Sequence, residues 1–207
     1  DGTDVSKEAS EMILVTDDFR AIPLAIREGR KIYDNIRKFI AFLLSCNIAE
    51  VLIIFLATVF GWPLPLVVLQ ILWINIITDG FPALALGSDP ASENVMKRPP
   101  RDPREKILSK HTMAFIVLIS LIVTGVTLGV FYYYLSEAVP LARTMAFTTI
   151  ILVELAVVYI VRSGYSIKPL SNKWLNMSVL LSFGLLLVVL YTPLNKIFRT
   201  VPLSITN

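Results

Sequence analysis

The sequence predicts an all-α polytopic transmembrane helix bundle with a short cytoplasmic N-terminal segment. Two observations predict this fold class. The chain of 207 residues is 55% hydrophobic and only 17% charged, whereas soluble domains average about 45–50% apolar and about 25% charged residues. The apolar residues also gather in five stretches, each near the roughly 20 residues that a helix needs to cross a bilayer. We therefore expect an integral, multi-pass protein of the cell membrane.

The first 37 residues are mixed and polar, and they precede a membrane domain that we place at 38–207. Residues 12–15 (MILV) are expected to form a short buried strand. A helical pattern follows, which we expect to run without a break into the first span; its apolar positions are Ile22, Ile26, Ile32 and Ile36. Because the chain begins at Asp1 without an initiator Met or a signal peptide, we expect it to be a piece of a longer protein.

Five spans follow in order along the chain. The first two are joined by a short connection that contains Trp62 and Pro63, residue types that suit the membrane interface and the end of a helix. The predicted spans are 39–60, 65–87, 112–134, 142–161 and 175–192.

The loop from Ser88 to His111 carries six lysine and arginine residues. By the positive-inside rule this loop and the N-terminal segment are cytoplasmic. Topology thus accounts for the net charge of +3, and we expect no nucleic-acid partner. Between prolines of this loop, Arg101, Asp102 and Arg104 are expected to form an ordered hairpin that contacts the first helix; the alternative is a solvated charged loop.

Three acidic residues lie inside predicted spans: Glu50, Asp79 and Glu154. A charge at mid-bilayer costs at least about 2.5–3.5 kcal/mol, so acids there indicate function. Asn47 and Glu50 are three residues apart and share a helix face. Asn75, Thr78 and Asp79 follow the same spacing on the second span. Three helices therefore offer oxygen-bearing side chains to a common interior.

Carboxylate, amide and hydroxyl oxygens suit hard cations such as Ca²⁺, which takes 6–8 oxygens at about 2.3–2.6 Å. No cluster of His or Cys points to zinc or copper. Gly80 and Pro82 weaken the helix beside Asp79, and broken helices at membrane depth often line ion sites. The predicted metal ligands are Asn47, Glu50, Asn75, Thr78, Asp79 and Glu154; no residue is assigned a catalytic or cofactor-binding role.

Each of these residues also has a structural interpretation. A single Asn or Thr in a span commonly joins two helices by a hydrogen bond. Glu154 could be a protonated carboxyl group bonded to a neighbour, and Asp79-Gly80 could be a turn. Three acids with helically phased amides are harder to explain in this way than any one residue.

The sequence resembles the type-II P-type cation-transporting ATPases over essentially its whole length. GTDVSKEASEMILVTDDF and EGRKIYDNIRKFI are similar to the junction between the phosphorylation domain and the membrane in that family. LWINIITDGFPALALGSDP and the RPPR that follows resemble its sixth membrane helix and the next cytoplasmic loop. The calcium-pump branch, in a bacterial or archaeal form, is the most similar.

The resemblance implies that the six predicted ligands bind a transported Ca²⁺ on the fifth, sixth and eighth helices of a pump. It also implies that residues 1–37 are the end of the phosphorylation domain and a stalk helix. The hairpin expected at Arg101–Arg104 would contact the phosphorylation domain as well as the first helix. The chain has no DKTGT, TGE or PEGL motif, so ATP and Mg²⁺ would bind in other domains of the parent, and this fragment alone is not catalytically competent. The expected partners are the cation, the lipid bilayer, the N-terminal cytoplasmic domains and the first four helices.

Two other functions remain open at this point. The same class of pump could carry Na⁺, H⁺ or Mn²⁺. In a different class, the chain could be a small stand-alone channel or structural membrane protein.

Overall fold

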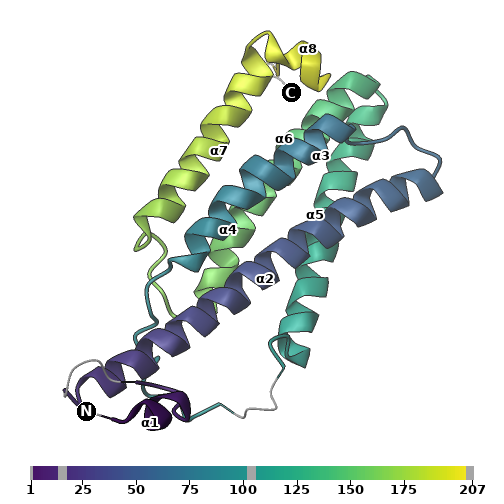
Figure 1. The fold of residues 1–207 in the computed structure, drawn as a ribbon. Coiled ribbons are helices and arrows are strands. Elements are labelled where there is room, and N and C mark those ends of the chain that lie inside the picture. Colours follow the sequence, from purple (N-terminus) through teal and green to yellow (C-terminus); the bar gives the residue numbers. More distant parts are fainter. Residues whose placement is uncertain (1, 14–17, 102–105, 204–207) are drawn as a thin grey trace.

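The computed structural model describes residues 2–13, 18–101 and 106–203, and the regular structure of these residues is entirely helical (Figure 1). Five helical runs within these described residues are long and apolar enough to cross a membrane, which confirms the predicted all-α bundle. They are α2 (Ala21–Val59), the consecutive elements α3 (Val68–Trp73), η1 (Ile74–Asp79) and α4 (Gly80–Gly87), then α5 (Lys110–Leu135), α6 (Val139–Ser163) and α7 (Lys173–Tyr191).

Helix α2 is continuous over 39 residues, as the sequence predicts. At 1.5 Å per residue it is about 58 Å long, about twice the thickness of the hydrocarbon core, and Figure 1 shows its N-terminal part extending beyond the other spans. It ends where Gly61 adopts a φ of +69°. The Trp62 amide donates to the Ala57 carbonyl and the Gly61 amide to Thr58, which satisfies two terminal carbonyls.

Helices α2 and α5 pack closely through small and hydroxyl-bearing residues. Ala49 and Ala57 on α2 are fully buried. The Ser120 hydroxyl donates to the Ser45 carbonyl at 2.9 Å and Thr124 donates to the Ala49 carbonyl at 3.4 Å. Close approach of this kind is how transmembrane helices associate without a hydrophobic driving force between them.

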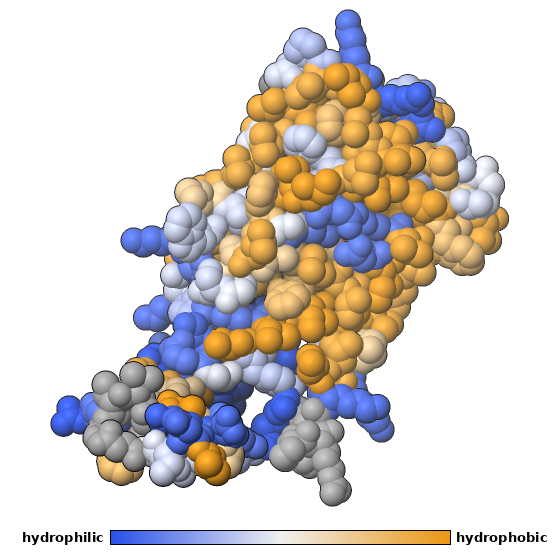
Figure 2. Space-filling view, viewed as in Figure 1, coloured by the Kyte–Doolittle hydropathy of each residue, from blue (hydrophilic) through white to orange (hydrophobic). Residues whose placement is uncertain are grey.

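The outer surface of the bundle is largely apolar (Figure 2). Large side chains such as Leu118, Leu121 and Leu180 are exposed, as expected for residues that face lipid chains. Hydrophilic residues gather at the end that carries the N-terminus, and the marked C-terminus lies at the opposite end (Figures 1 and 2). A chain that crosses the bilayer an odd number of times likewise has its two ends on opposite sides.

Two short helices lie outside the spans: α1 (Asp4–Glu8), where the Thr3 side chain accepts from the Ser6 amide, and α8 (Leu194–Phe198). Helix α8 is tied to the second span because Gln70 Nε2 donates to the Phe198 carbonyl at 3.0 Å. Both are far too short to cross a bilayer.

Two local predictions differ in outcome. The strand predicted at 12–15 is wrong for its first half, because Met12 and Ile13 are exposed and outside regular structure, while Leu14 and Val15 lie outside the described residues. In the predicted 101–104 hairpin, the Arg101 guanidinium lies 4.0 Å from the Tyr33 ring centroid on α2, a contact with the first helix as expected. Asp102 and Arg104 lie outside the described residues.

Candidate cation site

The three acids of the spans lie in the interior of the bundle. Asp79 and Glu154 are fully buried and Glu50 is 5% exposed. They come from three elements, η1, α6 and α2 respectively. None of them makes an ion pair with a base in the described part of the chain, so their charge has no counter-ion from the protein itself there.

Asp79, Glu154 and Cys46 form a compact cluster. One carboxylate oxygen of each acid and the Cys46 sulfur lie within 4.8 Å of one another. Two ionised carboxylates at that distance repel by roughly 3 kcal/mol at an effective dielectric constant of about 20. The arrangement is therefore stable only with protons or with a cation between the oxygens.

Six oxygens of this region are buried and accept or donate no hydrogen bond within the described residues. They belong to four side chains on three helices: one oxygen of Glu50, the Thr78 hydroxyl, and both oxygens of Asp79 and of Glu154. A buried polar atom without a partner costs about 1–3 kcal/mol, and more when charged. Four of the six belong to Asp79 and Glu154, which approach one another within the cluster, so a proton or a cation there would lower this cost.

Glu50 is joined to the second span. Asn75 Nδ2 donates to Glu50 Oε2 at 2.7 Å and also to the Ile71 carbonyl at 3.0 Å. Both amide hydrogens are thus used, which leaves the Asn75 side-chain oxygen as an acceptor. The contact fixes α2 and η1 relative to one another beside the acid cluster.

The second span is a π-helix where it carries the predicted ligands, between Ile74 and Asp79. Such segments occur mostly as single-turn bulges inside α-helices, and frequently at functional sites. Pro82 has no amide to offer the Ile77 carbonyl five residues earlier, and Ser182 of α7 donates to that carbonyl at 3.2 Å instead. The predicted weakening by Gly80 and Pro82 therefore takes the form of a change in helical register, which a neighbouring helix stabilises.

Asn47 is not brought into the cluster. Its side chain is exposed, and its Nδ2 donates to the Leu43 carbonyl at 2.8 Å. The three-residue spacing to Glu50 leaves the two side chains about 60° apart around the helix, which is enough to turn one inward and the other outward. Of the six predicted ligands, the structure gathers buried oxygens from Glu50, Thr78, Asp79 and Glu154, attaches Asn75 to Glu50, and leaves Asn47 on the surface.

Cys46 is the member that the sequence analysis missed. It is fully buried and its sulfur belongs to the cluster. Cys46 lies four residues before Glu50, the spacing of a shared helix face, and that spacing could have drawn attention to it.

A second buried polar cluster, also missed, lies at the N-terminal end of the bundle. Asp89 is fully buried and accepts from Lys38 Nζ at 2.7 Å, from Arg162 Nε at 3.1 Å and from Asn172 Nδ2 at 3.0 Å. Asn35 Nδ2 donates to the Asp89 carbonyl at 2.9 Å. This ion-pair cluster (Lys38, Asp89, Arg162, Asn172 and Asn35) joins α2, the end of α4, α6 and the start of α7. Its bases are paired, so it is structural and does not neutralise the three acids.

The sequence is similar to a known family and to a bacterial protein. Residues 63–207 match the family model described as cation transporting ATPase, C-terminus. The calcium-transporting ATPase of Bacillus subtilis (strain 168) is 44% identical over 210 residues, covering 98% of this chain and 24% of that protein.

Animal proteins are similar to the same extent. The calcium-transporting ATPase type 2C member 1 of Homo sapiens is 44% identical over 213 residues, covering 100% of this chain and 23% of that protein. The type 2C member 2 of Homo sapiens is 42% identical over 207 residues, covering 96% of this chain and 22% of that protein. The chain therefore spans about a quarter of the length of the curated relatives it matches.

Proposed function

The chain belongs to the family of cation-transporting ATPase C-terminal regions, and from that membership we propose that it forms the membrane-embedded, cation-binding part of an ATP-driven calcium pump. The pump would move Ca²⁺ out of the cytoplasm. ATP and Mg²⁺ would bind in domains outside this chain.

The observation that carries this proposal is the group of six buried oxygens without hydrogen-bond partners on Glu50, Thr78, Asp79 and Glu154. Carboxylate and hydroxyl oxygens are the ligands that Ca²⁺ prefers, and it needs 6–8 of them. Three acids supply the charge that a divalent ion requires. The relatives are named calcium-transporting ATPases, which agrees with this choice of ion.

Asn47 and Asn75 enter the proposal with different roles. The Asn75 side-chain oxygen lies beside Glu50 and is available to an ion as a further ligand. Asn47 would become a ligand only if other parts of the longer protein cover that face of α2, or if α2 rotates. Such a rotation is one way in which a 39-residue helix could couple events outside the membrane to the ion.

Phosphorylation from ATP in the presence of different metals tests the choice of ion. We expect the full-length protein to form a phosphoenzyme when micromolar Ca²⁺ is added, and not with Na⁺ or at low pH alone. Activation by Na⁺ without Ca²⁺ would show a different pump of the same class. No phosphoenzyme with any cation would favour a channel or structural protein.

A further inference from the structure

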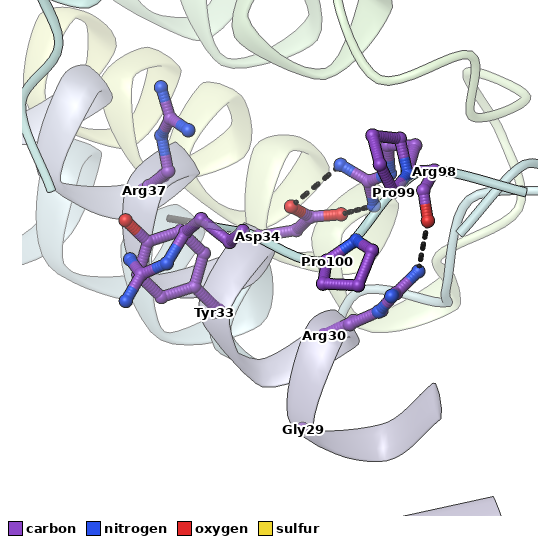
Figure 3. Close-up of a pocket in the computed structure, with 9 residues that line it drawn as sticks. Gly29, Arg30, Tyr33, Asp34, Arg37, Arg98, Pro99 and Pro100 are labelled. Atoms are coloured by element: carbon purple, nitrogen blue, oxygen red, sulfur yellow. Dashed lines mark hydrogen bonds and ion pairs between the residues drawn. The ribbon is translucent and has the colours of Figure 1, made fainter. Parts of the chain in front are cut away.

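A cavity of about 570 Å³ lies where the N-terminal part of α2 meets the loop after α4. Gly29, Arg30, Tyr33, Asp34 and Arg37 line it from α2, and Arg98, Pro99, Pro100 and Arg101 line it from the loop. Figure 3 shows Pro100 between Arg98 and Arg30, with Tyr33 and Arg37 on the other side of Asp34. We call this the arginine cavity. It is separate from the cation site.

Positive charge in the arginine cavity exceeds negative charge. Among the described residues that line it there are four arginines and one acid, Asp34. Arg98 is paired with Asp34 through both guanidinium nitrogens, and this contact raises the pKa of Arg98 above its ordinary value. Arg98 therefore stays charged at any physiological pH, and Asp34 is fully engaged by it.

Arg30 and Arg101 make no ion pair with any residue that the structure describes. Arg30 Nη1 donates to the carbonyls of Val95 at 2.9 Å and Arg98 at 2.7 Å, which orients the guanidinium without neutralising it. Arg101 stacks on the Tyr33 ring at 4.0 Å from its centroid and makes no hydrogen bond or ion pair to any described residue. A planar guanidinium held by stacking presents its N–H groups in the fork that matches phosphate oxygens.

Tyr33 adds a polar group that lacks a partner. Its hydroxyl is buried and makes no hydrogen bond within the described residues. A phenolic O–H that loses water usually finds an acceptor, and an anion in the arginine cavity would supply one. The surplus charge and this hydroxyl independently point to an anionic, oxygen-rich ligand.

The position of the arginine cavity indicates where the anion comes from. Tyr33 and Arg37 precede the start of the first apolar stretch at Phe39 by six and two residues, or about 9 Å and 3 Å along the helix. The headgroup region adds about 5–7 Å to each side of the hydrocarbon core. The end of the cavity at Tyr33 and Arg37 thus lies near the level of lipid phosphates, while Gly29 and Arg30 extend it to about 15 Å before Phe39. The positive-inside rule assigns this side to the cytoplasm.

We propose that the arginine cavity binds a phosphate group, supplied by an anionic lipid of the cytoplasmic leaflet. The positive-inside rule alone explains why bases lie on this side of the membrane. It does not require four of them to converge on one hollow around a buried hydroxyl. Basic pockets beside transmembrane helices are a known way of holding lipid headgroups.

The test is binding of phosphatidic acid to the purified full-length protein, compared with phosphatidylcholine of the same chain length and with inorganic phosphate. Arg101→Gln removes one charge without removing a hydrogen bond to the described protein, and Tyr33→Phe removes only the hydroxyl. Lys97→Gln is the matched control, because Lys97 is exposed on the same loop and does not line the cavity. All variants are checked for unchanged thermal stability.

We expect phosphatidic acid to bind and phosphatidylcholine not to. Arg101→Gln should weaken binding about fivefold, the effect of one basic side chain near an anionic surface, Tyr33→Phe should weaken it less, and Lys97→Gln should leave it unchanged. Binding of inorganic phosphate as tight as that of phosphatidic acid, with the same dependence on Arg101, would support the phosphate pocket and refute the lipid as its source. Equal losses for Arg101→Gln and Lys97→Gln, or no binding of either phosphate, would overturn the proposal.

Discussion

The side chain of Asn75 donates a 2.7 Å hydrogen bond to Glu50 and thereby joins the π-helical segment of the second span to α2. The bond uses one oxygen of Glu50 and leaves the other buried without a partner. Glu50 is therefore held in one orientation beside the cluster of Asp79, Glu154 and Cys46.

Removing the Asn75–Glu50 contact should lower the calcium affinity of the full-length protein. Hydrogen bonds to charged groups contribute about 1.5–3 kcal/mol, so Asn75→Ala should weaken calcium activation by about tenfold or more. Because Asn75 acts partly through Glu50, the losses caused by Asn75→Ala and Glu50→Gln should not add in the double variant. Calcium titrations of phosphoenzyme formation measure this, and strictly additive losses would show that the two residues act separately.

Glu154 should matter for calcium although it is the only acid of its helix. Glu154→Gln removes one negative charge from the cluster and should weaken calcium activation, because hard divalent ions are held largely by the charge of their ligands. Glu137→Gln, in the exposed connection between α5 and α6, is the matched control and should have no effect. Identical calcium titrations for the two variants would remove Glu154 from the site.

The reaction rate of the Cys46 thiol should show whether calcium occupies the cluster of Asp79 and Glu154. Its sulfur lies within 4.8 Å of oxygens of Asp79 and Glu154, so a calcium ion held by those oxygens should slow the reaction of Cys46 with a small neutral thiol reagent. The measurement uses full-length protein in which cysteines outside this chain are replaced. Asp79→Asn should abolish the protection. A modification rate that calcium does not change would mean that the ion binds elsewhere.

The ion-pair cluster around Asp89 should contribute to stability and not to ion binding. Asp89→Asn leaves the buried Lys38 and Arg162 without their anion, and breaking a buried pair in this way costs about 3–5 kcal/mol. The exposed Glu93, four residues further on, gives the control Glu93→Gln. Heating in detergent followed by size-exclusion chromatography should show loss of folded protein at lower temperature for Asp89→Asn alone, and equal stability of both variants would contradict a structural role.

Sequence alone was sufficient for the architecture. Runs of about 20 apolar residues determine helices in a bilayer because every backbone group must be satisfied internally. The same logic identified Glu50, Asp79 and Glu154, since an acid in lipid is too costly to keep without a role. Gly80 and Pro82 also predicted an irregular helix, but they did not predict that it would be a π-helix.

What sequence did not supply is the rotation of each helix about its own axis. Spacing predicts that Asn47 and Glu50 share a face, yet a 60° difference places one outside and the other inside. The proximity of Cys46 to Asp79 and Glu154 depends on how α2, η1 and α6 pack, which periodicity within a single helix does not determine. The sequence places Asp89 in a polar loop and does not indicate its burial, because its partners Lys38 and Arg162 are 51 and 73 residues away along the chain.

The central claim is that Ca²⁺ binds to the buried oxygens around Asp79, and equilibrium binding of radioactive calcium to the purified full-length protein tests it most directly. We predict saturable binding at micromolar calcium that Asp79→Asn abolishes, while the variant remains folded in the membrane, because the substitution keeps the size of the side chain and removes one charge of the ion site. Calcium affinity in the Asp79→Asn protein equal to that of the unaltered protein would contradict both the ligand assignment and the choice of ion.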